Sequence, residues 1–543
     1  MLARKSFLII ITQFVVLFCG WLGFIVLAKV WGDFAPAAMG IIGFALSFIS
    51  LFGIITDLGF ASAHVKRVSE GQDLGKCIGT FATIKIILTT LMIIAVIGTI
   101  FVWKNFFKGG FEDATTEPVI YVMIFYLIFR NLQAIPLRTF SARREIAKLQ
   151  VSTLFENFVH IPLTVIVAMA GVTGVMIDGK MIDIAPAVHW PEILQPVQQF
   201  MQNHILGSFA MTYVLGGMAV FLVGMWFMRK YPVKKPDWNL FKYYFKFAFP
   251  VIISSIIATI ATNVDKVMIG YYWTQTEVGY YFAFERVIGL IMVLHSAVGT
   301  VLFPTISEQN AKNNTKGIIS TVKTAERYIS MIIIPPIGFI LIFLRPVIGV
   351  ILNEAFLPAA SVLMVLLAMQ FIRGLTSPYS NLINGVNRPD LLAKIGVVTC
   401  IVNIILNFLF IPKNGLLSSF GISGPTGAAT ATVISFIVPL IGLRIIAKKL
   451  VKIKLFQTHT IRHIIAGALT CAILYIIAYK TTILPGLHWY TLLLLAVISL
   501  GIYIAILFLL REFTKKDLDF FLKIINPRGM AKYVKDEIKT KKK

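Results

Sequence analysis

Charged residues are scarce in this sequence. Asp, Glu, Lys and Arg make up 14% of the 543 residues, whereas 57% are hydrophobic and the mean hydropathy is +0.83. In an ordinary soluble domain about a quarter of the residues are charged, so the composition excludes that class. Apolar runs fill the chain instead, many of them about 18 residues or longer, which is enough for a helix to cross a bilayer. We therefore predict an all-α polytopic membrane protein.

Cysteine is also rare. Cys19, Cys77, Cys400 and Cys471 lie far apart, and none belongs to a CxxC pair. This spacing argues against a disulfide framework and against a zinc site. A Walker A loop is missing too, because GQDLGK at residues 71–76 has the wrong spacing and no Ser or Thr after its lysine. ATP is therefore excluded as the direct energy source, and neither a cofactor nor a metal is expected.

Acidic motifs of sugar-transferring enzymes are sparse as well. The DxD pattern occurs only at residues 517–519, in the predicted cytoplasmic tail. A lone DxD is a weak signal, and no acidic motif stands in a predicted outer loop. The chain is therefore predicted not to be an enzyme.

The apolar runs predict fourteen membrane-spanning helices. The first run is too long for the core of a signal peptide, so we interpret it as a span. The predicted helices lie near residues 6–30, 35–59, 77–103, 118–136, 149–171, 206–228, 247–271, 279–303, 326–345, 358–381, 391–411, 425–446, 461–479 and 488–510.

Acidic residues are outnumbered two to one. The chain has 50 Lys and Arg residues and 25 Asp and Glu residues, a net charge of +25. The cations gather in every second loop and at both ends of the chain. By the positive-inside rule these loops and both termini face the cytoplasm, where they attract anionic lipids. Because no groove-reading module accompanies the charge, nucleic acid is excluded as a partner.

The sequence resembles itself at an offset of about 240 residues. Met39-Gly40 is mirrored by Val278-Gly279, and Arg130 is mirrored by Arg373. Two copies of one helix bundle are typical of transporters that hold the substrate between their halves. The expected division is an N-terminal six-helix bundle at 1–228, a cytoplasmic basic linker at 229–246, a C-terminal six-helix bundle at 247–450, an extra helix pair at 451–510 and a basic cytoplasmic tail at 511–543.

Charged side chains inside the predicted spans mark the candidate substrate-binding site, because a lone charge in lipid costs about 2.5 kcal/mol or more. Within TNVDKVMIG at residues 262–270, Lys266 shares a helix face with Thr259 and Thr262, and Asp265 lies on the adjoining strip. Such polar stripes line either a packed interface or a cavity, and we favour the cavity. The candidate residues are Lys29, Asp57, Arg130, Asp265, Lys266, Glu285, Arg286 and Arg373.

Structural alternatives stand beside these assignments. Asp265 and Lys266 have the alternative of a mutual ion pair, and Arg130 and Arg373 have that of a purely structural role. Lys85 lies one third of the way into its span and is expected to snorkel to the cytoplasm. Interhelical hydrogen bonds, rather than a proton relay, are expected for two polar pairs spaced four residues apart: Glu156 with His160, and Asn403 with Asn407.

Two motifs resemble a known family. DKVMIG followed by VGYYFA, residues 265–283, is similar to the signature at helices 7 and 8 of polysaccharide-type flippases, which belong to the multidrug/oligosaccharidyl-lipid/polysaccharide exporter superfamily. DLGFASA at 57–63 resembles the early motif of that family, and the resemblance covers residues 6–510. Fourteen helices is also the count of its lipid II flippase branch, in which the extra pair forms a groove for the lipid tail. The first span lacks the Arg-Asp pair that this branch implies, with Lys29 the nearest cation, so a substrate other than lipid II is expected.

The resemblance implies a flippase that moves a polyprenyl- or dolichyl-(di)phosphate-linked oligosaccharide from the inner to the outer leaflet by alternating access. The cationic candidates would attract the phosphates of the carrier. We expect a monomer in the plasma membrane of a prokaryote, functionally linked to glycosyltransferases. A multidrug or cation exporter of the same fold is the first alternative, and a membrane glycosyltransferase or polymerase is the second. The glycan, the carrier and the coupling ion stay open.

Overall fold

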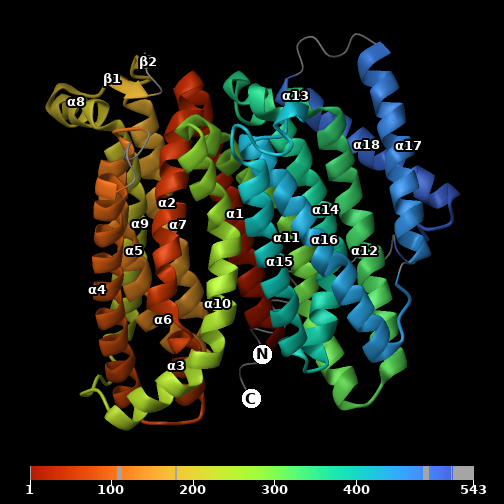
Figure 1. Ribbon diagram of the computed structural model, residues 1–543, viewed down its shortest axis with the longest axis horizontal. Helices are drawn as coiled ribbons and strands as arrows, with labels where there is room; N and C mark the ends of the chain where they lie inside the picture. The colour runs from red at the N-terminus through yellow and green to blue at the C-terminus, as the bar shows by residue number, and fades with distance from the viewer. Residues whose placement is uncertain are drawn as a thin grey trace.

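The computed structural model describes residues 2–106, 113–177, 180–455, 457–480, 488–514 and 517. Long helices dominate it, which confirms the predicted all-α membrane fold (Figure 1). Eleven described stretches are long and apolar enough to cross a bilayer, and one of them, Val15–Asp57, contains parts of two helices. The long helices overlap the predicted spans one by one: α1 (Leu2–Trp31), α2 (Ala35–Asp57), α4 (Leu74–Phe106), α5 (Thr116–Leu132), α7 (Ile146–Met169), α9 (Ile205–Met228), α10 (Trp238–Tyr272), α11 (Gln275–Ala311), α12 (Thr315–Ile342), α14 (Ala360–Gly385), α15 (Pro389–Phe410), α16 (Gly424–Val451), α17 (Thr458–Lys480) and α18 (Trp489–Leu509).

Short elements cap the ends of these helices. The segment between α7 and α9 contains an antiparallel hairpin of β1 (Val172–Ile177) and β2 (Lys180–Ile184), followed by α8 (Gln195–Asn203). The remaining short elements are η1 (Gly32–Phe34), α3 (Phe60–Ser69), α6 (Ala134–Ala142), η2 (Glu192–Leu194), α13 (Leu344–Ile351), η3 (Glu354–Ala359) and η4 (Ser418–Phe420).

The connection between the two predicted bundles is shorter than expected. The α10 helix begins at Trp238, because the side chain of Asp237 caps it by accepting a hydrogen bond from the backbone N–H of Asn239 at 2.9 Å. Asp237 also lies 3.0 Å from the ammonium of Lys76, a hydrogen bond that lowers the pKa of the Asp237 carboxyl. The basic connection is thus fastened to the start of α4.

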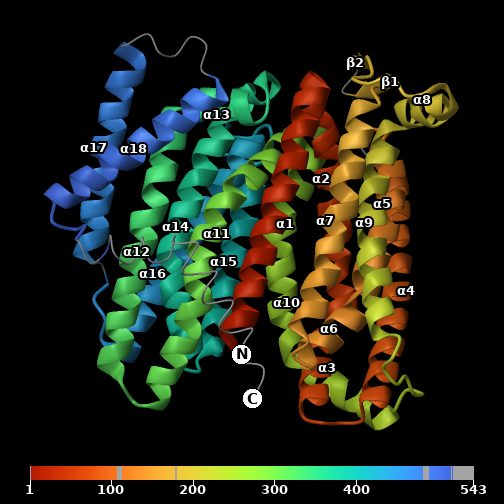
Figure 2. The same ribbon diagram turned by 180° about the vertical axis from the view of Figure 1, so that it is seen from behind.

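Two groups of helices stand side by side. In both views α4, α5, α7 and α9 lie on one side and α11, α12, α14, α15 and α16 on the other, with α1 and α10 between them (Figures 1 and 2). The α17 helix packs against α12 and α18. We refer to α1–α9 as the first half and to α10–α18 as the second half. That these halves are copies of one bundle stays a prediction.

The two halves touch closely where α2 packs against α11. A Cβ atom on Gly40 would lie 1.6 Å from the carbonyl oxygen of Gln275, and one on Gly279 would lie 1.7 Å from that of Pro36. No other residue type permits backbones to approach this closely. Both glycines belong to the segments that mirror each other in the sequence. The contact lies at the start of α2 and α11, toward the end of the molecule that bears β1, β2 and α13 (Figure 1).

Candidate functional site

A cavity of about 630 Å³ lies between the two halves. Its wall comes from α2, α4, α5, α6, α10 and α11, with single residues from α3 and α9. Ser47, Ser50 and Gly53 of α2 line it, as do Thr259 and Thr262 of α10. The small and hydroxyl-bearing stripes seen in the sequence therefore face a cavity at these positions.

Positive charge dominates the cavity wall. Among the described residues that line it, the cations outnumber the carboxylates by five to two. Both carboxylates lie within 4 Å of a lysine. The three arginines of the cavity form no ion pair with any of the described residues. The cavity therefore offers arginine side chains to an anionic ligand. The cations are Lys85, Arg130, Arg138, Lys266 and Arg286, and the carboxylates are Asp57 and Glu285.

Lys266 and Asp265 point in different directions and have different partners. The ammonium of Lys266 lies 2.8 Å from a carboxylate oxygen of Glu285 and donates to the carbonyl of Thr262 at 3.0 Å. Consecutive residues of a helix lie about 100° apart, so Asp265 faces away from the cavity. The alternative of a mutual Asp265–Lys266 ion pair is therefore wrong in this conformation.

Asp265 belongs to a buried cluster between α10, α11, α15 and α16. Its carboxylate accepts hydrogen bonds from Tyr281 at 2.8 Å, Asn407 at 2.6 Å and Thr432 at 2.8 Å. Asn403 in turn hydrogen-bonds both Asn407 and Thr432, which confirms the expected interhelical role of the two asparagines. Carboxylate, amide and hydroxyl oxygens are the ligand types of hard cations. Asp265 is a candidate that the structure places outside the cavity lining.

Asp57 and Lys85 meet at the end of α2. The ammonium of Lys85 donates to the carbonyl of Thr56 at 2.7 Å and lies 3.8 Å from an Asp57 carboxylate oxygen. Only 2% of the Lys85 residue is exposed, so the expectation that it snorkels to the cytoplasm is wrong. The α2 helix ends at Asp57, and the chain turns at Gly59, which has a φ of +79°. This helix end offers Lys85 the Thr56 carbonyl and the Asp57 carboxylate as partners within the protein.

Arg130 is tied into a chain of polar side chains in the first half. Its guanidinium donates to the hydroxyl of Tyr126 at 3.0 Å, and that hydroxyl donates to Glu156 at 3.2 Å. His160, one turn from Glu156, hydrogen-bonds the hydroxyl of Thr212 at 3.0 Å. Both partners lie on other helices, which confirms the expected interhelical bonds of this pair. The Arg130 side chain is thereby oriented along the cavity wall.

Arg286 reaches the same region from the second half. Its guanidinium carbon lies 5.1 Å from the centre of the Phe282 ring, within the range of a cation–π contact. Together with Arg130 and Glu156 it also lines a smaller cavity of about 260 Å³ next to α1, α5 and α7. Arginines from the two halves thus face common space.

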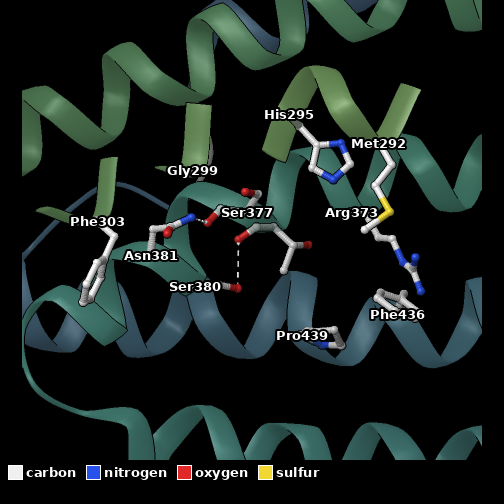
Figure 3. A pocket seen from close by; sticks show the side chains of 11 residues that line it. Met292, His295, Gly299, Phe303, Arg373, Ser377, Ser380, Asn381, Phe436 and Pro439 are labelled. Carbon is white, nitrogen blue, oxygen red and sulfur yellow. Dashed lines mark hydrogen bonds between the residues drawn. The ribbon is translucent and has the colours of Figure 1, made fainter. Parts of the chain in front are cut away.

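Besides Asp265, two further candidates do not line the central cavity. Arg373 lines a separate cavity of about 730 Å³ between α11, α14 and α16, where its guanidinium lies 4.6 Å from the centre of the Phe436 ring (Figure 3). Lys29, near the end of α1, donates a hydrogen bond to the carbonyl of Gly349 in α13. Arg373 and Lys29 are therefore separated from the five candidates that line the central cavity.

Sequence reasoning missed four charged or amide side chains of the central cavity: Lys85, Asn131, Arg138 and Asn263. Arg138 stands in a basic stretch that was interpreted only as an orientation signal. The short helix α6 instead turns it toward the cavity. The spacing in the sequence could have indicated this position. Arg138 follows Asn131 and Arg130 of α5 by seven and eight residues, about two helical turns, and both of those residues line the cavity.

Comparisons with known proteins place the fold in context. A family model described as "Polysaccharide biosynthesis protein" matches residues 203–361. The "Probable low-salt glycan biosynthesis flippase Agl15" of Haloferax volcanii is 25% identical over 410 residues, 75% of each chain. An uncharacterized membrane protein of Methanocaldococcus jannaschii is 31% identical over 143 residues, 26% of each chain.

Solved structures share the same architecture. The lipid II flippase MurJ in an inward closed conformation matches with a TM-score of 0.65 and 17% identity, over 92% of this chain and 98% of that one. This likeness shows the fold that the sequence resemblance to the multidrug/oligosaccharidyl-lipid/polysaccharide exporter superfamily predicts. An inward-facing multidrug transporter of this superfamily matches with a TM-score of 0.60 and 12% identity, over 78% of this chain and 93% of that one, which shows the common fold. The family-model match contains α10 and α11, and with them Lys266, Glu285 and Arg286.

Proposed function

We propose that this protein is a flippase for an oligosaccharide linked to a polyprenyl or dolichyl (di)phosphate. The observation that carries the proposal is the charge of the central cavity, where three arginines lack a carboxylate partner among the described residues and both carboxylates already have a lysine. Arginine binds phosphate oxygens through two parallel hydrogen bonds, which suits a carrier diphosphate. The name of the Haloferax volcanii relative supports a glycan-linked substrate.

Lys266 and Glu285 supply a means for the substrate to act on the protein. Their 2.8 Å contact joins α10 to α11. A phosphate entering between Lys266 and Arg286 competes with Glu285 for the lysine, and binding therefore loosens this joint. Alternating access requires such a change in contacts between helices on substrate binding.

Direction and location follow from the charge of the loops. We propose that the cavity loads at the cytoplasmic leaflet and releases at the outer leaflet of a prokaryotic plasma membrane, with both termini cytoplasmic. Glycosyltransferases would supply the loaded carrier, and the monomer would suffice, because the cavity is formed within one chain.

A multidrug exporter is the second candidate, and the shared fold of the multidrug transporters favours it. A cationic drug would need an acidic cavity side chain without a cation beside it. Glu285 and Asp57 both have a lysine within 4 Å, so the cavity charge supports the anionic substrate instead.

The test is translocation in proteoliposomes that contain the purified full-length protein and a fluorescent polyprenyl-diphosphate oligosaccharide. We expect the protein to expose fluorescent lipid from the inner leaflet to a quenching reagent added outside the liposomes. The rate of this quenching should be at least tenfold slower for Arg130→Ala and for Arg286→Ala. A sugar-transfer assay on the same preparation separates a glycosyltransferase. Failure of the wild type to move the labelled lipid, with transport of an organic cation in its place, would refute the flippase.

A further inference from the structure

A second cavity lies wholly within the second half. It holds about 730 Å³ and is walled by α11, α14 and α16 (Figure 3). Arg373, Met292 and His295 lie at one end of it, and Asn381 and Phe303 lie at the other. The function proposed for the central cavity makes no use of this space.

Arg373 is the cation of this cavity. Among the described residues its guanidinium has no hydrogen-bond or ion-pair partner, and it lies 4.6 Å from the centre of the Phe436 ring. A guanidinium held away from bulk water is stabilised by an anion that accepts its paired N–H groups. The aromatic ring packs against the cation, whose guanidinium lies beside Phe436 at the end of the cavity that also holds Met292 and His295 (Figure 3).

The other lining groups are polar but uncharged. Thr376, Ser377, Ser380 and Asn381 present hydroxyl and amide groups from one face of α14. His295, 7% exposed, has no hydrogen-bond partner on Nδ1 among the described atoms. Neutral hydrogen-bonding groups beside aromatic and apolar side chains suit a polyol, whose hydroxyls pair with the former and whose C–H groups pack on the latter.

The two cavities differ in the charge that they offer. The central cavity has five cations and suits a multiply charged diphosphate, whereas the Arg373 cavity has one cation among neutral groups. Both reach the same face of α11, because Glu285 and Met292 are seven positions apart, or about 10 Å along the axis. The two cavities therefore follow one another along α11.

We propose that the Arg373 cavity binds an acidic sugar of the transported glycan, with the sugar carboxylate on Arg373 and the sugar hydroxyls on Ser377, Ser380 and Asn381. The proposal rests on the flippase function and specifies its substrate class as a glycan that carries a carboxylated sugar. It assigns Arg130 and Arg373 different ligands, although the two residues mirror each other in the sequence.

The experiment measures equilibrium binding to the purified full-length protein in lipid nanodiscs. The probes are a tetrasaccharide that contains glucuronic acid, a neutral tetrasaccharide of the same length, and inorganic pyrophosphate. We expect the wild type to bind the acidic probe about tenfold more tightly than the neutral one, the gain of a charge-assisted hydrogen-bond pair. Arg373→Gln should abolish this ratio, and Arg373→Lys should keep part of it because the charge remains while the forked donor is lost.

Arg345→Gln is the matched control, because it removes one exposed arginine of the same half that lines neither cavity. It should leave the ratio unchanged, and Arg130→Gln should weaken pyrophosphate binding only. Equal binding of both sugars by the wild type overturns the proposal even where the Arg373 variants do not fold. Loss of pyrophosphate binding in Arg373→Gln with the sugar ratio intact also overturns it. A wild type that prefers the acidic sugar but does not translocate lipid would refute the flippase function and leave this site standing.

Discussion

Lys266 is the residue at which the proposed function makes substrate binding compete with helix packing. The Lys266 residue is only 6% exposed, and its ammonium lies 2.8 Å from a carboxylate oxygen of Glu285. Removing the ammonium therefore leaves this carboxylate without its partner. We predict that Lys266→Ala slows translocation at least tenfold and that Lys266→Arg retains part of the rate. The decisive variant is Lys266→Ala combined with Glu285→Ala, which removes both charges.

That double variant should fold and still fail to translocate, because the phosphate contact is missing although no charge is left unpaired. The readout is the proteoliposome rate together with the amount of folded protein. Full recovery of the rate in the double variant would show that the Lys266–Glu285 pair is structural. Glu285→Gln alone should bind pyrophosphate at least as tightly as the wild type, since the competitor for Lys266 is gone.

Asp265 is predicted to support stability rather than substrate binding. Asp265→Ala leaves three buried donors, on Tyr281, Asn407 and Thr432, without their acceptor. Each unsatisfied group costs about 1–3 kcal/mol, so a clear fall in the melting temperature of the purified protein is expected. Pyrophosphate binding should persist in the folded fraction.

Asp33→Ala is the control for this variant, because it removes an exposed carboxylate that lines neither cavity. It should melt close to the wild type. An Asp265→Ala protein that melts like the wild type and yet has lost pyrophosphate binding would place Asp265 in the substrate site instead.

The pair at 265 and 266 shows what a sequence can and cannot tell about single residues. The 100° step between neighbours predicts that the two side chains face different surroundings. The partners themselves come from residues 16 to 167 positions away, such as Tyr281 and Thr432, and only the packing of α10 against α15 and α16 brings them there. Lys85 fails for the same reason, since its acceptor is the end of another helix.

At the scale of helices, the contact of α2 with α11 is the joint between the halves. Because a Cβ on Gly279 would overlap the Pro36 carbonyl, Gly279→Leu must push the two helices apart. We predict a longer distance between spin labels at Asp33 and Arg345, which are exposed near the same end of the two halves. Double electron–electron resonance on the purified protein measures it.

Gly98→Leu is the matched control for this contact. It also places a large side chain on a membrane helix, but nothing lies within 4 Å of its Cβ position, so the label distance should stay unchanged. An unchanged distance in Gly279→Leu, with the protein folded, would mean that the halves adjust locally and that the glycine contact does not hold them together.

Helix positions were predictable because burial in lipid demands long apolar runs whatever their tertiary partners are. The exceptions are informative. The start of α10 was placed nine positions late, at residue 247 instead of Trp238, because its first turns are aromatic and basic and depend on the Asp237 cap. The β1–β2 hairpin was missed because register in a short two-stranded unit is set by its turn and neighbours rather than by hydropathy.

At the scale of the whole molecule, two cavities of different charge share one helix. The sequence marked Glu285 and Arg286 of α11 as candidates, but it did not show the division of this helix between two cavities. That division depends on which helices stand opposite, α2 and α10 for one cavity and α14 and α16 for the other. The proposed lipid-linked glycan would place its diphosphate in the cationic cavity and a sugar in the cavity lined mainly by neutral groups.

The orientation of the molecule in the membrane is the last prediction. Figure 1 places α3 and α6 at one end of the bundle and β1, β2, α8 and α13 at the other. The loops at the α3 and α6 end carry most of the Lys and Arg residues, and moving such loops across an energised membrane is unfavourable, so this end should face the cytoplasm. Cysteines introduced at Lys235 and Asn313 should therefore react with a membrane-impermeant maleimide only in inverted vesicles, and one at Ser419 should react in intact cells. All three positions are exposed, so lack of reaction reports sidedness rather than burial. Labelling of Lys235→Cys in intact cells would reverse the orientation, and the central cavity would then load from the opposite leaflet.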